Sequence, residues 1–277
     1  MKVLSLFDGM SCGQIALDKL GIKNEYFASE IDKFAIKVTQ ANYPNTTQLG
    51  DVTKVSKECD LLLAGSPCQG FSVSGKQLNF TDPRSKLFFE FVRIKNESKP
   101  KYFLLENVKM KKEWQDVIST YLGCEPIEIN SSLVSGQNRR RLYWTNIPTK
   151  LPIDKNISFK DILEDGVDDK YYVSEKQKAR LDKGNLTTCG GICFKLPGQE
   201  LAKSPCLMAR DYKGIPGRQL FPIAIDKELR KLTPVEYERL QTVPDNYTAA
   251  VSDTQRYKML GNGWTVEIIK HILEGIK

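Results

Sequence analysis

The most constraining feature of this 277-residue chain is the regular alternation of strand-like and helix-like segments in its first half. Short apolar runs such as residues 2–7 and 61–65 have the length of buried strands, and amphipathic segments such as 85–98 lie between them. This alternation predicts an α/β domain with a mostly parallel sheet. Parallel sheets bind their ligands at the carboxyl ends of the strands, so the loops that follow the strands are the expected site.

The alternation fails in one internal region, which divides the chain into three parts. Strands are expected at 2–7, 26–30, 46–51, 61–65, 102–107 and 140–148, and helices at 12–21, 32–43, 85–98, 114–123, 233–241 and 265–277. Residues 1–148 form the expected α/β domain, 149–231 an insertion or small second domain, and 232–277 the return of the chain to the first domain. Thr233 and Pro234 suit the N-cap and the first turn of a helix.

The positive charge of the chain is concentrated in the irregular region. The formal net charge is +7, and residues 176–218 contain nine Lys or Arg but only three acids. This segment is either a solvated surface or a face that contacts phosphates. The sequence predicts no secretory signal and no membrane span, so we expect a cytoplasmic protein.

The cysteines do not predict a disulfide framework or a zinc site. Their number, seven, is odd, which argues against a set of paired disulfides in a cytosolic chain. Cys189 and Cys193 are close in sequence, but no second pair follows and the only histidine is His271. Four zinc ligands are therefore not recognisable, and histidine-based acid–base catalysis is disfavoured.

The loop after the first strand, "FDGMSCG" at 7–13, is placed like a nucleotide-binding loop but has no GxGxxG pattern. Glu30 ends the second strand, where an acid suits a ribose diol. Asp51 ends the third strand and could face an adenine amino group. Ribose and adenine contacts without a phosphate-binding loop favour S-adenosylmethionine over a dinucleotide, and ordinary loop acids are the alternative.

Two further strand ends carry reactive groups. Cys68 follows the strand at 61–65 and Glu106 lies in the strand at 102–107, so a thiol and a carboxyl group are expected near each other. In "QNRRR", the alternation of Gln137, Arg139 and Arg141 would direct all three side chains to one side of a strand. Arginines near a thiol favour the thiolate. Alone, Cys68 could equally be a small buried residue.

Taken together and in order, these motifs identify a family. The chain contains "FDGMSCG", "GSPCQGFS", "ENV", "QNRRR", "RKLTPVEYERLQTVPDNY" and "GNGW". It closely resembles C5-cytosine-specific DNA methyltransferases of the bacterial and phage type, over nearly all of the chain outside 149–231. The resemblance implies a Rossmann-like S-adenosylmethionine-dependent methyltransferase sheet with a small inserted target-recognition domain. It also implies S-adenosyl-L-methionine as cofactor, with S-adenosyl-L-homocysteine as product, and a flipped-out cytosine in a specific duplex site as substrate.

The resemblance also implies roles for individual residues. Cys68 would attack cytosine C6, Glu106 would hold the proton at N3, and Arg141 with Arg139 would bind the O2 side of the base. Cofactor contacts are implied for Phe7, Gly9, Ser11, Cys12, Glu30, Ile31, Asp51, Val52, Pro67, Leu87, Asn262 and Gly263. The expected DNA-binding residues are Gln69, Ser72 and Gln137, together with Lys213 and Arg218 of the basic segment. Ser11 and Cys12 stand where the family commonly has a glycine pair.

Duplex DNA is the expected partner, and we expect a monomer that does not bind membranes. The resemblance also allows a cognate restriction endonuclease with the same site as a partner, in the context of restriction-modification. A tRNA cytosine-5 methyltransferase shares the same motifs, but a separate basic segment favours duplex DNA. A catalytically inactive DNA-binding relative is disfavoured because Cys68, Glu106, Arg139 and Arg141 are all present.

Overall fold

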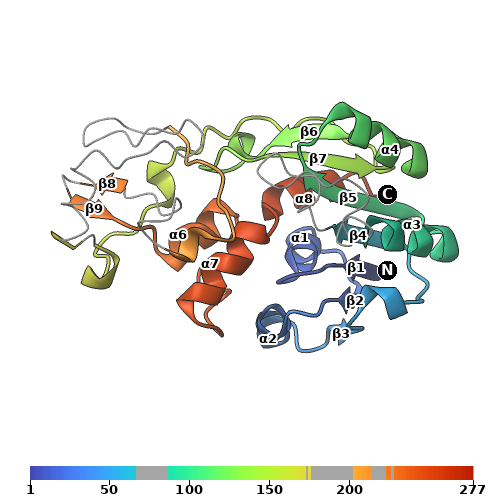
Figure 1. Ribbon diagram of the computed structural model, residues 1–277, viewed down its shortest axis with the longest axis horizontal. Helices are drawn as coiled ribbons and strands as arrows, with labels where there is room; N and C mark the ends of the chain where they lie inside the picture. The colour runs from blue at the N-terminus through green and yellow to red at the C-terminus, as the bar shows by residue number, and fades with distance from the viewer. Residues whose placement is uncertain (67–86, 173, 176–201, 214–222, 226–227, 277) are drawn as a thin grey trace.

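A computed structural model describes residues 1–66, 87–172, 174–175, 202–213, 223–225 and 228–276 of the protein. Its centre is a seven-stranded sheet with the order β3-β2-β1-β4-β5-β7-β6 (Figure 1). The strands are β1 (Lys2–Leu6), β2 (Glu25–Ser29), β3 (Thr47–Gln48), β4 (Leu61–Gly65), β5 (Tyr102–Val108), β6 (Ile127–Asn130) and β7 (Arg140–Thr145). The pairs from β3 to β5 are parallel, whereas β7 is antiparallel to β5 and β6. This confirms the expected α/β, Rossmann-like class.

Helices cover both faces of the sheet, which explains why its central strands are almost entirely apolar. In β4, Leu61 and Leu63 belong to one core cluster, and Leu62 and Ala64 to the other, as the period of two in a strand requires. One cluster includes α1 and α8, which pack together, and the other includes α3 and α4 (Figure 1). The helices are α1 (Cys12–Lys19), α2 (Lys33–Asn42), α3 (Leu87–Ser98), α4 (Lys112–Leu122), α6 (Pro234–Leu240), α7 (Asp253–Asn262) and α8 (Val266–Leu273).

Most of the expected elements are confirmed, with small shifts at their ends. Thr233 caps α6 through a capping box with Glu236, and Pro234 occupies the first turn. The strand expected at 46–51 is only two residues long, at Thr47–Gln48. The sequence interpretation missed β6 and α7 altogether, the first because it has four residues and the second because its apolar side chains are few.

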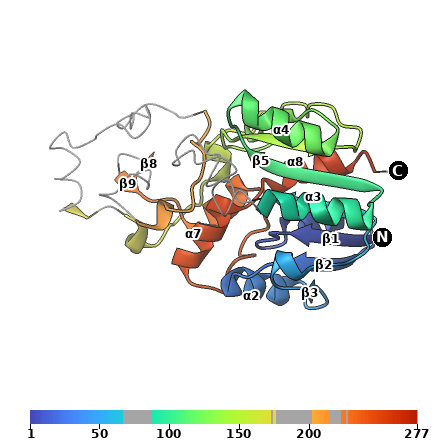
Figure 2. The ribbon, with the colours of Figure 1, turned by 45° about the vertical axis from the view of Figure 1, so that its right-hand side comes forward.

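The second half of the chain returns to the sheet through buried polar contacts. The hairpin of β8 (Ile223–Ile225) and β9 (Glu228–Arg230) lies at one end of the molecule, and α7 lies between it and the sheet (Figure 1; Figure 2). Arg230 donates to both carboxylate oxygens of Glu236 at 2.8 and 2.6 Å, and both side chains are buried. A paired buried charge of this kind fixes the direction in which the chain enters α6. Each helix of the described ranges is too short or too polar to cross a membrane.

Residues 202–213 lie within the predicted insertion but pack against the α/β domain. Ser204 forms an isolated bridge with Gln137, and the Met208–Ala209 backbone lies directly on Gly261 of α7. A Cβ atom added to Gly261 would lie 2.3 Å from the Met208 carbonyl carbon and 2.4 Å from the Ala209 nitrogen. Only a glycine therefore allows this approach of the two backbones.

We predict that Gly261→Ala destabilises the protein by about 2 kcal/mol or more, since the new methyl group must displace backbone rather than a side chain. Urea unfolding followed by circular dichroism measures the change. Lys112→Ala is the control, because Lys112 lies at the exposed start of α4 and its loss is expected to cost under about 0.5 kcal/mol. Equal stability of the Gly261 variant and the wild type would contradict the close packing of these two segments.

Candidate functional site

A cavity of about 690 Å³ lies at the carboxyl ends of the parallel strands. Its wall is formed by the loop after β1, the ends of β2, β4 and β5, the start of the antiparallel β7, and two segments from the second half of the chain. The lining residues that sequence reasoning had singled out are Phe7, Gly9, Cys12, Glu30, Glu106, Arg139, Arg141, Asn262 and Gly263. The topology therefore brings together side chains from widely separated motifs at the expected edge of the sheet.

Glu106 is the central carboxylate of the cavity. It lies on β5 opposite Gly65 of β4 and is 8% exposed. The Arg141 Nε is 3.0 Å from Glu106 Oε1, and the Trp264 indole nitrogen donates to Oε2 at 3.1 Å. Two donors from different parts of the chain thus fix the carboxyl group near the carboxyl end of β5.

Arg139 is placed near Glu106, but its guanidinium is directed to backbone carbonyls. It donates to Leu207 O at 3.0 Å, to Gly261 O at 3.3 Å and to Gly263 O at 2.9 Å, and it is 3% exposed. Burial lowers the pKa of the Arg139 guanidinium, and the nearby Arg141 lowers it further. The geometry therefore supports a role for Arg139 in holding the cavity wall together.

Gln137 is fully buried, in contrast to the expected DNA contact. Its amide nitrogen donates to Leu240 O at 3.2 Å and to Gln241 Oε1 at 3.3 Å, and its oxygen accepts from Leu207 N at 2.9 Å. The side chain has no exposed surface. Burial alternates along "QNRRR", but Gln137 and Arg139 precede β7, which begins at Arg140, and the segments packed over Gln137 leave it inaccessible to DNA in this structure.

The first loop is held in an unusual backbone conformation. Phe7, Gly9 and Ser11 all have positive φ values, of 55°, 61° and 60°. Glu30 stabilises this loop, because its carboxylate accepts from Gly9 N at 2.8 Å and also from Ile31 N and Asp32 N. Glu30 therefore lines the cavity and fixes the loop opposite it.

Buried polar groups support the same loop from beneath. Asp8 accepts from Ser11 Oγ and from the Tyr26 hydroxyl, and burial raises the pKa of Asp8 to about 6. Ser11 is fully buried, so it supports the loop rather than lining the cavity. Cys12 does line the cavity, and burial raises the pKa of its thiol to about 12. A thiol with so high a pKa is a poor nucleophile.

Four other residues expected in the cofactor site do not line this cavity. Asp51 is exposed and caps the short helix at Val52–Lys54 by accepting from Thr53 N at 3.0 Å. Ile31 is 78% exposed, Val52 is buried in the core, and Leu87 begins α3 against that core. Their assignment to the cofactor remains a proposal from the resemblance.

Several predicted site residues lie outside the described residues. These are Pro67, Cys68, Gln69, Ser72 and Arg218, together with the Cys189 and Cys193 pair. Lys213 is the last residue of the short helix at Asp211–Lys213, and only its backbone is among the described parts. Within the described ranges, no group of three or more His, Cys, Asp or Glu side chains is arranged as a metal site.

The structure adds residues that sequence reasoning missed. Cys206 lies in the cavity wall, where Arg139 donates to its sulfur at 3.3 Å, and Arg141 approaches it at 3.9 Å. No local motif marks Cys206, because it is brought there by the fold. Trp264 is the last residue of the "GNGW" motif. The sequence predicts that this motif lies near the cofactor, but it cannot show where the indole ring points.

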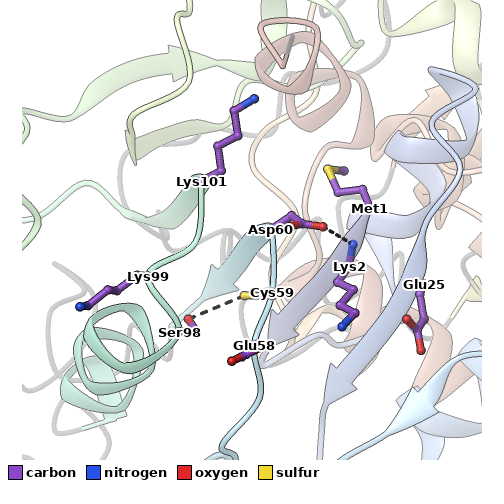
Figure 3. Close-up of a pocket in the computed structure, with 9 residues that line it drawn as sticks. All are labelled: Met1, Lys2, Glu25, Glu58, Cys59, Asp60, Ser98, Lys99 and Lys101. Atoms are coloured by element: carbon purple, nitrogen blue, oxygen red, sulfur yellow. Dashed lines mark hydrogen bonds between the residues drawn. The ribbon is translucent and has the colours of Figure 1, made fainter.

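A second cavity, of about 550 Å³, lies at the opposite end of the sheet. Figure 3 shows its lining residues, which surround the starts of β1, β2, β4 and β5. Asp60 is engaged by Lys2 N at 2.7 Å, and the Cys59 sulfur lies 3.8 Å from Ser98 Oγ. Burial raises the pKa of the Cys59 thiol. The second cavity is lined by both acidic residues and lysines, and it contains none of the motif residues. The first cavity is therefore the candidate site.

Comparisons with known proteins agree with the geometry of the first cavity. A sequence model described as C-5 cytosine-specific DNA methylase matches residues 1–120 and 130–277. The Type II methyltransferase M1.ScrFI of Lactococcus lactis subsp. cremoris is 35% identical over 303 residues, which cover 99% of this chain and 77% of that protein.

Two further comparisons extend over nearly the full length of both partners. The Type II methyltransferase M.NlaX of Neisseria lactamica is 34% identical, with coverage of 100% of this chain and 96% of that protein. The solved structure of the Entamoeba histolytica methyltransferase EhMeth superposes with a TM-score of 0.80 at 20% identity, covering 100% of this chain and 99% of the other. The likeness to that structure concerns the fold.

Buried Asp211 predicts a particular dependence of stability on pH. Burial raises the pKa of Asp211 from 3.8 to about 7, although Met208 N and the Tyr237 hydroxyl donate to the carboxylate at 2.8 and 3.1 Å. Between these pH values the folded state holds a proton that the unfolded state has lost. Stability therefore falls as pH rises through this range, by at most about 1.4 kcal/mol per pH unit.

We expect Asp211→Asn to flatten the fall in unfolding free energy between pH 6 and 7, measured by urea titration. Asp8→Asn is the control, because the pKa of Asp8 is about 6 and the larger part of its contribution therefore falls below pH 6. The Asp8 variant should keep most of the slope between pH 6 and 7, and Asp211→Asn should lose most of it. An undiminished slope in Asp211→Asn would contradict a neutral Asp211 in the folded protein.

Proposed function

The chain belongs to the C-5 cytosine-specific DNA methylase family, and on that basis we propose how this S-adenosylmethionine-dependent DNA (cytosine-5-)-methyltransferase acts. It transfers a methyl group to C5 of a flipped-out cytosine in a specific duplex site, through a covalent bond between Cys68 and C6. The observation that carries this proposal is the Glu106 carboxylate, held by Arg141 near the carboxyl end of β5 and paired with Gly65, the last residue of β4, three residues before Cys68 in the sequence.

The cavity fits S-adenosylmethionine by the chemistry of its lining. Phe7 offers an aromatic face, Glu30 offers carboxylate oxygens for a ribose diol, and Gly9 allows close approach of the backbone. Asn262 and Gly263 come from the end of α7 and lie on the same cavity. The volume of about 690 Å³ is ample for a ligand of this size. When bound, S-adenosylmethionine supplies an electrophilic methyl group and leaves as S-adenosylhomocysteine.

The chemistry requires a nucleophile and a proton donor on the cytosine ring. The Cys68 thiolate adds to C6, and Glu106 gives a proton to N3, so that the electron pair of the former C5–C6 double bond becomes available at C5. C5 takes the methyl group. Removal of the C5 proton by a base then restores the double bond and expels the thiolate, and Glu106 takes back the N3 proton.

The two arginines of this site, Arg139 and Arg141, contribute positive charge and hydrogen-bond donors but do not exchange protons. Arg141 is permanently cationic and lies against Glu106 Oε1, so it orients the carboxyl group and offers donors to the O2 side of the base. Arg139, by its contacts, supports the wall behind it. We therefore propose that Arg141 contacts the base and that Arg139 holds the wall of the cavity in which the base binds.

DNA is proposed to bind across the open side of the cavity. A cytosine inside a duplex cannot reach Glu106, so it must leave the base stack at a cost of a few kcal/mol. Residues 149–231 are the proposed target-recognition domain, between the catalytic parts 1–148 and 232–277. Within it, the basic segment 176–218 is the proposed phosphate-binding face.

The first test of this mechanism is covalent trapping. Duplex DNA with 5-fluorocytosine at the target position should form a stable adduct with the enzyme, because fluorine cannot leave C5 as a cation. The adduct should require S-adenosylmethionine, since it accumulates after methyl transfer. Denaturing gel electrophoresis detects it, and peptide mass spectrometry should locate the bond at Cys68.

Two cysteines that line the cavity, Cys12 and Cys206, make the mapping decisive. Cys12 and Cys206 both line the site, so Cys12→Ser and Cys206→Ser are the matched controls and should still be trapped. Cys68→Ser should give no adduct, because a hydroxyl is far harder to ionise than a thiol. A bond to Cys12 or Cys206 would refute the assignment of Cys68. Replacement of the duplex by tRNA should give no methyl transfer.

The basic segment makes a separate prediction about salt. Each phosphate contact contributes about −0.9 to the slope of log affinity against log salt concentration. Lys213→Gln and Arg218→Gln should each reduce the steepness of that slope by about one contact, as measured by fluorescence anisotropy with labelled duplex DNA. Lys112→Gln is the control, since Lys112 is an exposed lysine on α4, and its slope should equal that of the wild type. Unchanged slopes in both test variants would exclude these residues from the DNA face.

A further inference from the structure

The Trp264 side chain lies next to Glu106, where the proposed chemistry occurs. Its neighbours in the "GNGW" motif, Asn262 and Gly263, are proposed to contact the cofactor. Its indole nitrogen is 3.1 Å from Glu106 Oε2, and it is one of the cavity-lining residues. We propose that Trp264 is a positioning residue for Glu106, whose indole N–H fixes the carboxyl group for proton exchange with cytosine N3. This inference rests on the proposed role of Glu106.

The carboxyl group is held from two sides by donors that cannot take its proton. Arg141 Nε binds Oε1 from β7, and Trp264 Nε1 binds Oε2 from the turn between α7 and α8. A guanidinium does not deprotonate in proteins, and an indole N–H only donates. The two bonds therefore orient the carboxyl plane, and each oxygen keeps a second lone pair that can serve the base.

The indole is itself fixed by close packing. A Cβ atom on Gly65 would lie 2.8 Å from Trp264 Nε1 and 3.2 Å from Cε2, so the ring rests directly on the backbone at the end of β4. A Cβ atom on Gly13 would lie 3.7 Å from Cζ3. The Trp264 carbonyl accepts from the Cys12 sulfur at 3.8 Å. The glycine at 65 thus makes room for the ring, and Gly13 is within ordinary contact distance of it.

The backbone on either side of Trp264 is anchored as well. Arg139 and the amide of Gln241 donate to Gly263 O at 2.9 and 3.1 Å. The Thr265 hydroxyl donates to Gln241 Oε1 at 2.9 Å. A ring with a fixed backbone, a fixed face and a single N–H can hold one carboxylate oxygen in one place, which is what positioning requires.

The position of the ring also connects Glu106 to the nucleophile. Gly65 and Glu106 are register partners on β4 and β5, and Cys68 follows Gly65 by three residues in sequence. Trp264 contacts the first two at once. The ring therefore contacts both the Glu106 carboxylate and the last residue of β4, three residues before Cys68 in the sequence.

The test is a double-mutant cycle of Trp264→Phe and Glu106→Gln. Phenylalanine keeps an aromatic ring against Gly65 but removes the N–H. We expect the single-turnover rate of methyl transfer, at saturating duplex DNA and tritiated S-adenosylmethionine, to fall about tenfold in Trp264→Phe, as for the loss of one hydrogen bond to a charged group. In Glu106→Gln the same substitution should change the rate by less than about twofold, because the group that it serves is gone.

Binding measurements separate positioning from a general structural role. The dissociation constants of Trp264→Phe for S-adenosylhomocysteine and for duplex DNA should stay within about twofold of the wild type, which places the loss in the chemical step. If phenylalanine destabilises the fold, 3-benzothienylalanine at position 264 replaces it, because this analogue has the shape of tryptophan with sulfur in place of the N–H.

Each result of the cycle has a distinct meaning. An equal rate loss in both backgrounds would overturn the inference, since Trp264 would then act independently of Glu106. An unchanged rate in Trp264→Phe, or in the benzothienyl variant, would also overturn it while leaving the role of Glu106 intact. A normal rate in Glu106→Gln itself would remove the proposed role of Glu106, and with it the premise of the inference.

Discussion

The buried guanidinium of Arg139 is the interaction on which the rest of the site depends. It joins three carbonyl groups, at Leu207, Gly261 and Gly263, that come from two segments far apart in the sequence. A charge buried to 3% exposure is costly unless its donors are satisfied, so these segments cannot separate without a large penalty. These hydrogen bonds therefore hold residues 207, 261 and 263 together in the wall of the cavity.

The sheet supplies the other half of the site for a simple reason. Parallel strands end at one edge, so the residues that follow β1, β2, β4 and β5 converge without any special contact between them. The antiparallel β7 adds its first residues at the same edge, which brings Arg141 to Glu106. Side chains from distant motifs thus meet because of strand direction, and their final orientation comes from the second half of the chain.

This division explains how far the sequence could predict the structure. The strand at Leu61–Gly65 was predicted with its observed bounds, because a central strand leaves an unbroken apolar run. The expected alternation in "QNRRR" placed Arg139 near Arg141, but it could not show that carbonyls at 207, 261 and 263 would occupy its guanidinium. Burial of Gln137 follows from the same packing. Contacts between remote segments leave no local periodicity from which to predict them.

The buried glutamates show how geometry distinguishes a structural carboxylate from a chemical one. Glu236 has no exposed surface, and it accepts from Arg230 and from the backbone nitrogens of Thr233 and Glu164. These bonds hold the chain in place, and because Glu236 is buried, a substrate cannot reach its carboxylate. Glu106 differs because its two donors are side chains that themselves line a cavity. A carboxylate that is firmly oriented by groups that cannot accept its proton, and that lines a cavity which a substrate can enter, is suited to exchange a proton with a bound base.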